Sequence, residues 1–306
     1  MYKLFRVLRK EKKIVVCYSG GLGNQMFEYA YEQKLRHLGK DTEADVSSYL
    51  TKKTTNREFV LDNVFPNIIL DKVDENEMLT YRRNKKYLIS LMRALSQIRF
   101  INGMWNYDRG CLYEIPSAYK VSWGVMEGYW QSHKYFDDIA DKIRQDFEFA
   151  SIELHQHKSL VSQIDACESV AIHLRGGDYL DNNNFNKYGG ICTLSYYRTA
   201  VKYIQEHTSS PHFFVFSNDM IWARNVMEKL DIVNVTYVDG ENYPNRKDWN
   251  DLYFMTRCKH IIIANSSFSW WGAWLGTNSN RIVVAPARWI NENRRNEICP
   301  DDWICV

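Results

Sequence analysis

The chain lacks the features that define several large classes of protein. No run of about 18 apolar residues occurs, so the sequence predicts no membrane-spanning helix. The 306 residues carry a net charge of only +2 and no clustered basic face, which argues against a nucleic-acid partner. The seven cysteines form no Cys-x-x-Cys pair, so neither a zinc ribbon nor a thioredoxin-like redox site is encoded. We therefore expect reduced cysteines, several of them buried, in a cytoplasmic protein.

Residues 1–13 are basic and mildly amphipathic, but they lack the apolar core and the cleavage site of a signal peptide. Two interpretations stay open. The segment is either a solvated leader or a weak peripheral contact with the anionic inner face of a membrane.

Short apolar runs alternate with amphipathic segments along most of the chain. The runs predict strands at 14–18, 124–130, 169–174, 212–217, 234–238, 260–264 and 281–285. The segments predict helices at 25–38, 134–147, 195–207, 220–230, 250–258 with Asn250 as cap, and 267–276. This alternation is typical of an α/β fold with parallel, doubly wound sheets. We expect two domains, 14–155 and 156–306.

Three side chains of chemical interest lie at or just after the end of the strand predicted at 169–174. His173 and Arg175 stand at its end, and Asp178 follows after two glycines that let the backbone turn. Ligands of open α/β sheets bind at the carboxyl ends of the strands, and the fork of donors on an arginine suits a phosphate. We predict that Arg175 binds a nucleotide phosphate and that His173 contacts the nucleotide or orients Arg175. Asp178 or Asp181 could accept a proton from a hydroxyl.

Two other predicted strand ends carry small polar residues. They are Ser217, Asn218 and Asp219 after the strand at 212–217, and Asn265, Ser266 and Ser267 after the strand at 260–264. Each group precedes a predicted helix, so helix capping and nucleotide binding are both open. The tryptophans at 270, 271 and 274 fit either a helix core or a platform for a sugar ring.

A glycine loop follows the first predicted strand. Gly21, Gly23 and Asn24 precede a helix and could offer backbone N–H groups to an anion, although a plain tight turn explains them as well. The dinucleotide pattern G-x-G-x-x-G is incomplete, because Met26 stands where its last glycine belongs.

Four segments, in the same order, resemble the α-1,2-fucosyltransferase family (glycosyltransferase family 11 type). They are residues 20–27 (GGLGNQMF), 128–132 (GYWQS), 173–178 (HLRGGD) and 251–275, which contains SSFSWWGAWL. The resemblance implies a glycosyltransferase B architecture, in which two Rossmann-like domains face a cleft. It places the acceptor on the amino-terminal domain and the nucleotide on the carboxyl-terminal one. The arginine that usually contacts the diphosphate in this family corresponds to Arg175.

The same resemblance implies inverting transfer of L-fucose from GDP-fucose to the 2-hydroxyl of a galactoside, with neither metal nor other cofactor. No Asp-x-Asp triplet is present to hold a cation against the diphosphate. One departure is Gly176, since many family members carry a second arginine there. Two alternatives stay open: a nucleotide-sugar transferase of another sugar or linkage, and a carbohydrate-binding module without turnover.

Overall fold

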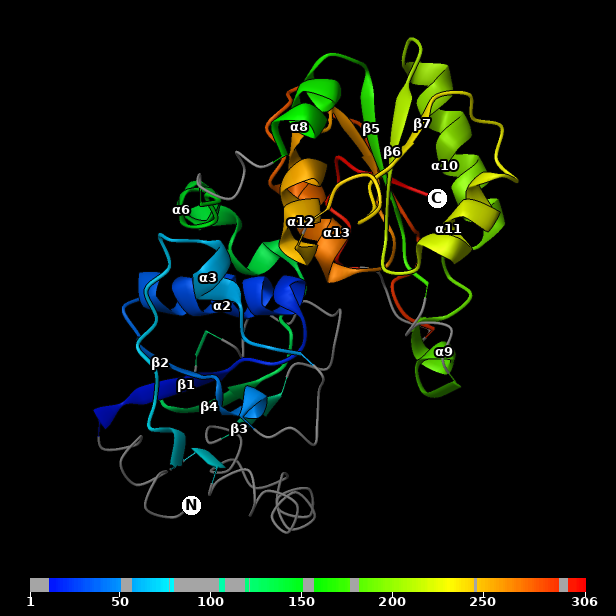
Figure 1. The fold of residues 1–306 in the computed structure, drawn as a ribbon. Helices are drawn as coiled ribbons and strands as arrows, with labels where there is room; N and C mark the ends of the chain where they lie inside the picture. Colours follow the sequence, from blue (N-terminus) through cyan, green and yellow to red (C-terminus); the bar gives the residue numbers. More distant parts are fainter. Residues whose placement is uncertain are drawn as a thin grey trace. The chain divides into compact units, whose positions relative to one another are not determined.

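The computed structural model describes residues 11–50, 57–76, 78–79, 105–107, 119–120, 122–150, 157–176, 182–244, 247–291 and 297–306. The chain divides into two compact units, Met1–Glu148 (unit 1) and Phe149–Val306 (unit 2), each with its own sheet (Figure 1). The predicted boundary at 155/156 falls within residues 151–156, which lie outside the described residues. All pairings between the strands of either sheet are parallel, so the expected α/β fold class is confirmed.

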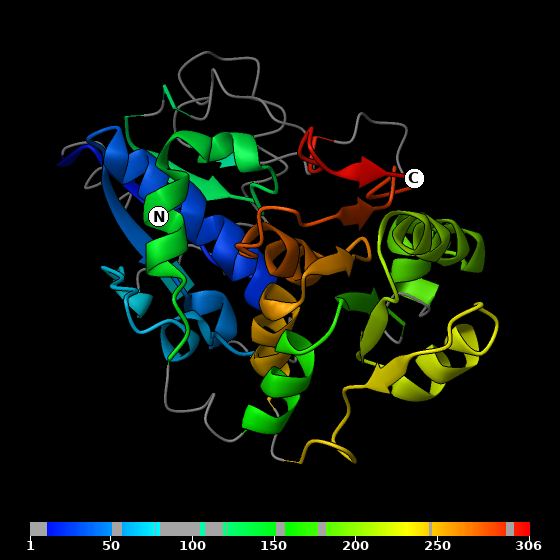
Figure 2. The same ribbon diagram turned by 90° about the horizontal axis from the view of Figure 1, so that it is seen from above.

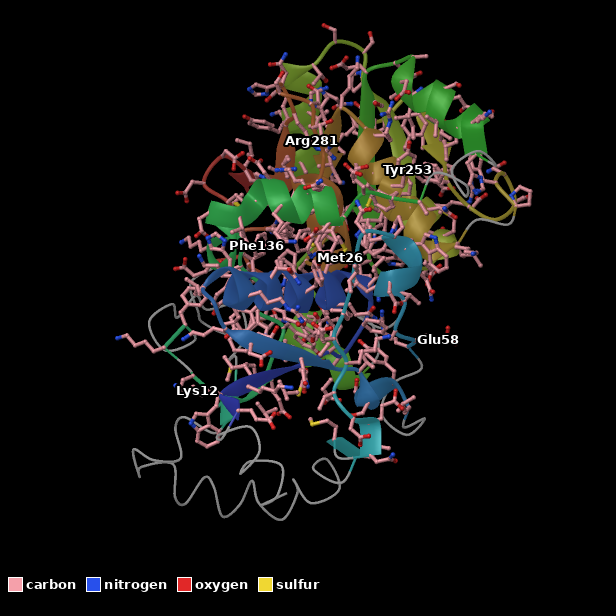
Figure 3. The ribbon with its side chains drawn as sticks, turned by 90° about the vertical axis from the view of Figure 1, so that its left-hand side faces the viewer. Lys12, Met26, Glu58, Phe136, Tyr253 and Arg281 are labelled. Atoms are coloured by element: carbon pink, nitrogen blue, oxygen red, sulfur yellow. A yellow bond between two sulfur atoms is a disulfide. The ribbon has the colours of Figure 1, made fainter. Side chains whose placement is uncertain are left out.

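Unit 1 is built on a four-stranded sheet in the order β2-β1-β4-β3. Its strands are β1 (Lys13–Cys17), β2 (Asp41–Asp45), β3 (Trp105–Tyr107) and β4 (Gly124–Glu127). Its helices are α2 (Leu22–His37), η1 (Ser47–Tyr49), α3 (Leu61–Val64), η2 (His133–Tyr135), η3 (Asp137–Ile139) and α6 (Ala140–Asp146). Helix α2 lies along one face of the sheet (Figure 1). Met26 of α2 and Phe136, both labelled in Figure 3, are fully buried.

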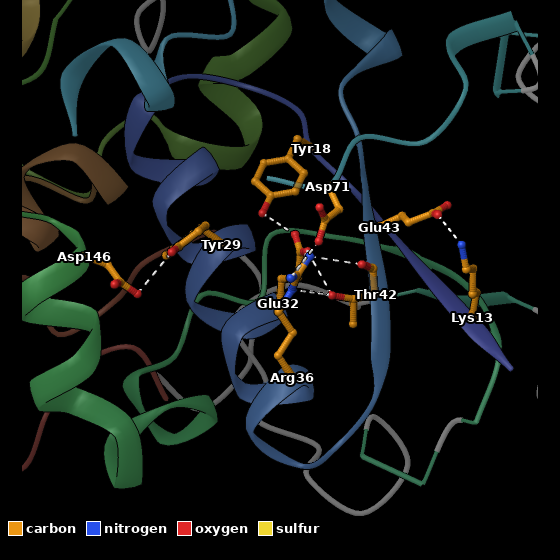
Figure 4. A network of polar contacts seen from close by, with 9 residues as sticks. All are labelled: Lys13, Tyr18, Tyr29, Glu32, Arg36, Thr42, Glu43, Asp71 and Asp146. Atoms are coloured by element: carbon orange, nitrogen blue, oxygen red, sulfur yellow. Dashed lines mark hydrogen bonds and ion pairs between the residues drawn. The ribbon is translucent and has the colours of Figure 1, made fainter. Parts of the chain in front are cut away.

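A buried acidic residue links α2 to the sheet of unit 1. The carboxylate of Glu32 is fully buried and accepts hydrogen bonds from the Tyr18 hydroxyl (2.6 Å), the Thr42 hydroxyl (2.9 Å) and the Arg36 guanidinium (3.0 Å) (Figure 4). Burial raises the pKa of Glu32, although these three donors oppose the rise. A buried carboxylate is costly unless it is hydrogen-bonded, so the bonds from Tyr18 and Thr42 fix the position of α2 on the sheet.

Unit 2 contains a six-stranded sheet in the order β10-β9-β8-β5-β6-β7. Its strands are β5 (Ser169–Leu174), β6 (His212–Ser217), β7 (Val235–Tyr237), β8 (His260–Ile262), β9 (Val283–Ala285) and β10 (Ile304–Cys305). Its helices are α8 (Lys158–Asp165), α9 (Asn182–Tyr188), α10 (Leu194–His207), α11 (Met220–Met227), α12 (Asp248–Arg257) and α13 (Ser267–Trp274). Helices α10 and α11 cover one face of the sheet, and α8, α12 and α13 cover the other (Figure 1 and Figure 2). This is the doubly wound arrangement that the sequence predicted.

The tryptophans of α13 belong to the core of unit 2. Trp270 and Trp271 are fully buried, and Trp274 is 8% exposed. The indole N–H of Trp270 donates to the carbonyl of Ile298 (2.8 Å), which satisfies its one polar group. Of the two interpretations, the structure supports helix core rather than a sugar platform for these three residues.

Two local expectations were wrong. Helix α12 begins at Asp248 after Lys247, and Asn250 is not its cap: its side chain instead accepts from the backbone N–H of Lys247 (2.8 Å). The helix predicted at 134–147 is two short 3-10 turns followed by α6.

The cysteines are not all reduced. Cys299 and Cys305 form a disulfide, because the turn before β10 brings their sulfurs together across six positions of sequence. Cys17 and Cys258 are buried thiols, as expected. No helix within the described ranges is long and apolar enough to cross a membrane.

Candidate functional site

The topology of unit 2 brings two of the predicted motifs to one edge of the sheet. Strand β5 lies at the centre; the chain continues outward through β6 and β7, then returns to β8 on the other side of β5. His173 lies at the end of β5, residues 175–176 follow this strand, and residues 265–267 follow β8. The two segments therefore flank the switch point between β5 and β8, where doubly wound sheets bind their ligands.

The backbone of the turn that carries Arg175 is held by side chains from two other elements. The hydroxyl of Tyr197, on α10, donates to the carbonyl of His173 (3.0 Å) and interacts with the backbone N–H of Arg175. Asn218, after β6, accepts from the N–H of Gly176 (3.1 Å) and donates to its carbonyl (3.4 Å). The turn is thus fixed on both sides, and Arg175, which is half-buried, belongs to it.

His173 is a neutral group beside Arg175. Its side chain is 3% exposed, and burial, together with the charge of Arg175, lowers its pKa from 6.5 to about 3. The ring is tilted against Phe268 of α13, with 6.2 Å between ring centroids. Its Nδ1 atom is buried and has no hydrogen-bond partner within the described part of the chain. A neutral imidazole supplies one donor and one acceptor, so His173 can bind a polar ligand without competing with Arg175 for an anion.

Helix α13 begins at the second motif. Ser266 is its N-cap residue, but the hydroxyl of Ser266 does not cap the helix, and Ser267 is the first helical residue. The N-terminus of a helix attracts anions through its backbone N–H groups and its dipole. Asn265 anchors the strand end, since its amide donates to the carbonyls of Tyr188 (3.1 Å) and Trp289 (3.2 Å).

The residues after β6 have two different roles: one caps a helix and another binds the turn that carries Arg175. Asp219 caps α11, because its carboxylate accepts from the backbone N–H of Trp222 (3.0 Å). The hydroxyl of Ser217 accepts from the backbone N–H of Asp219 (3.0 Å). Asn218 does not cap the helix; it holds Gly176 instead. The capping alternative thus describes Asp219, whereas Asn218 acts on the turn of Arg175.

The glycine loop lies in unit 1. Gly21 is the N-cap of α2 without a side-chain cap, and Gly23 is buried in the first turn of this helix. Asn24 accepts from the side chain of Gln131 (2.8 Å), which belongs to the segment after β4. Gln25 donates to the carbonyl of Glu58 (2.9 Å). The loop is therefore bound firmly into unit 1 and leaves the start of α2 uncapped by any side chain of its own.

Two of the predicted catalytic residues, Asp178 and Asp181, lie outside the described residues. Within the described ranges, no group of three or more His, Cys, Asp or Glu side chains could hold a metal ion. The sequence analysis missed Tyr197 and Trp222, which contact the turn of Arg175 from α10 and α11.

Comparisons with known proteins extend over both units. The sequence profile of the family described as Glycosyl transferase family 11 matches residues 13–306. The chain is 30% identical to an alpha-1,2-colitosyltransferase of Escherichia coli, over 96% of this chain and 98% of that protein. It is 29% identical to the O-antigen biosynthesis glycosyltransferase WbnK of Escherichia coli, over 94% and 98%. It is 26% identical to a galactoside alpha-(1,2)-fucosyltransferase 1 of Lagothrix lagotricha, over 49% and 42%.

Proposed function

Since this chain belongs to glycosyl transferase family 11 and is a glycosyltransferase, we propose that it transfers L-fucose from GDP-fucose to the 2-hydroxyl of a galactoside. In this proposal the reaction inverts the anomeric carbon and needs no metal. The observation that supports it is the fixed turn at the end of β5, which carries Arg175; β5 pairs with β8, the strand that leads into α13.

Arg175 and the start of α13 suit the diphosphate of the donor. In the reaction, the bond between the anomeric carbon and the β-phosphate oxygen breaks, and the electron pair stays on the phosphate. A guanidinium and a helix N-terminus stabilise the charge that grows there. His173, neutral at physiological pH, contributes hydrogen bonds rather than charge.

The acceptor attacks from the opposite face of the sugar. Its 2-hydroxyl oxygen forms the new bond to the anomeric carbon, and its proton passes to a carboxylate, for which the sequence suggests Asp178 or Asp181. Attack from the face opposite the leaving phosphate inverts the configuration.

A second donor deserves a direct test because of one relative. The alpha-1,2-colitosyltransferase aligns over nearly the whole chain at 30% identity. Colitose is L-fucose without its 3-hydroxyl, so one pocket can be tuned to either sugar. Rejection of a substrate that lacks a hydroxyl requires a buried polar group dedicated to that hydroxyl.

The experiment offers GDP-fucose, GDP-colitose and GDP-mannose separately with a panel of β-galactosides, with and without EDTA, and determines product linkage by NMR. We expect an α-1,2-linked product from GDP-fucose at an unchanged rate in EDTA. A faster reaction with GDP-colitose would show that GDP-colitose is the preferred donor and would leave the proposed α-1,2 linkage unchanged. Turnover that stops in EDTA, or a product of another linkage, would contradict the proposal. Glycan binding without GDP release would favour a binding module.

A further inference from the structure

The turn that carries Arg175 is also held from a third direction, by Trp222. A Cβ atom placed on Gly176 would lie 2.8 Å from Cε3 and 3.1 Å from Cδ2 of the Trp222 indole. Distances this short mean that the indole lies directly against the α-carbon of Gly176, in the space that any side chain at position 176 would need. A Cβ there would also lie 3.3 Å from Cβ of Asp219.

Trp222 is held at its backbone and packed along its ring. Its backbone N–H donates to the Asp219 carboxylate in the first turn of α11 (3.0 Å), and its ring packs on the edge of the core formed with β5 and β6. The indole is half-buried, so one part of it covers Gly176 while another remains near solvent. Insertion of even one methyl group into a packed contact forces side chains or backbone to shift.

Gly176 therefore does more than omit the second arginine of related sequences. With its N–H and carbonyl bound by Asn218 and its α-carbon covered by Trp222, this residue is fixed on three sides. Tyr197 fixes the two preceding peptide groups. The backbone of the turn therefore sets the direction in which the side chain of Arg175 leaves it.

We propose that Gly176 and Trp222 form a matched pair that, with Asn218 and Tyr197, positions Arg175 for the donor diphosphate. The four are positioning residues: they act through Arg175 rather than on the donor. The identification of the diphosphate as the ligand of Arg175 rests on the proposed function, whereas the pairing of Gly176 with the Trp222 indole rests on geometry alone.

The test measures GDP binding by calorimetry and the donor KM of the full-length enzyme. Gly176→Ala should weaken GDP binding by about tenfold or more, because small displacements of an aligned group cost one to two orders of magnitude. Gly240→Ala is the matched control, since no atom lies within 4 Å of a Cβ built there. The double variant Gly176→Ala/Trp222→Leu should recover most of the lost binding, because leucine vacates the space of the ring.

A second comparison separates positioning from general loss of stability. In an Arg175→Ala background, Gly176→Ala should change GDP binding no further, whereas a merely structural defect would add to the loss. Asn218→Ala, at an exposed position that should fold normally, should also weaken GDP binding, and only when Arg175 is present. Melting curves verify that each variant is folded.

Two failures can be told apart. If Gly176→Ala and Asn218→Ala bind GDP as the wild type does while Arg175→Ala does not, the matched pair is refuted and the role of Arg175 stands. If Arg175→Ala itself binds GDP normally, the proposed function loses its main support. Equal losses in the presence and absence of Arg175 would also overturn the positioning role.

Discussion

The buried imidazole of His173 makes a quantitative prediction about stability in acid. Its pKa is lowered from 6.5 to about 3, chiefly by burial and further by Arg175. Above pH 6.5 the group is neutral in both states, so the folded state suffers no penalty. As the pH falls below 6.5, the unfolded chain binds a proton that the folded chain refuses, and stability is lost until the pH nears 3.

The size of the effect follows from the shift. Each pH unit below 6.5 costs about 1.4 kcal/mol, so the step from pH 7.5 to 4.5 should remove about 3 kcal/mol through this one group. Carboxylates and other histidines also contribute, and their share is the same in a variant that lacks only this imidazole. The difference between wild type and His173→Asn therefore isolates the group.

The assay is urea unfolding followed by tryptophan fluorescence at pH 7.5, 6.0, 5.25 and 4.5. His173→Asn is expected to be less stable than wild type at pH 7.5 but to lose stability less steeply in acid. The difference in free energy of unfolding between wild type and variant should therefore change by about 3 kcal/mol, in favour of the variant, between pH 7.5 and pH 4.5. His173→Gln repeats the test with a longer amide. Curves that stay parallel would refute a neutral buried His173, and with it the hydrogen-bonding role assigned to this residue.

Three further results are expected. The Tyr18→Phe variant removes a donor to the buried Glu32 and should lower the free energy of unfolding by about 1–3 kcal/mol, measured in urea; an unchanged value would show that the bond is dispensable. Asp219→Ala removes the cap of α11 and should cost about 1 kcal/mol in thermal unfolding, whereas Asp219→Asn should retain most of the stability; equal losses would contradict the capping role. The pH profile of kcat/KM should show no inflection from His173 between pH 5 and 9, so its shape should be the same in His173→Asn.

Elements of the fold that the sequence predicted best are those buried on both faces. Strands β5 and β6 occur at the predicted residues, because strands covered by helices on two sides are read as continuous apolar runs. Strand β2, with the sequence DTEAD, escaped detection: its polar residues carry no strand pattern, and pairing with β1 determines its conformation. Strand β10 has two residues, too few for any periodicity.

The sequence predicts those site residues whose position follows from the order of the strands. It does not predict contacts between side chains that are distant in the sequence. Parallel strands place His173 and Ser266 at one edge of the sheet, so both residues can be identified from the predicted ends of the strands. Sequence signals for capping and for ligand binding are the same residue types, and only the bonds made by Asp219 and Asn265 tell the two uses apart. The contact of Trp222 with Gly176 joins residues 46 positions apart, and no local pattern marks it.

We propose that Arg175 binds the β-phosphate of the donor at the edge between β5 and β8. Calorimetry with GDP and GMP on wild type, Arg175→Ala and Arg175→Lys tests it most directly. Wild type should prefer GDP, and Arg175→Ala should lose that preference, at least about tenfold for a hydrogen bond to a charged group, with lysine restoring only part of it. A variant Arg175→Ala that still prefers GDP as strongly as wild type would contradict the account.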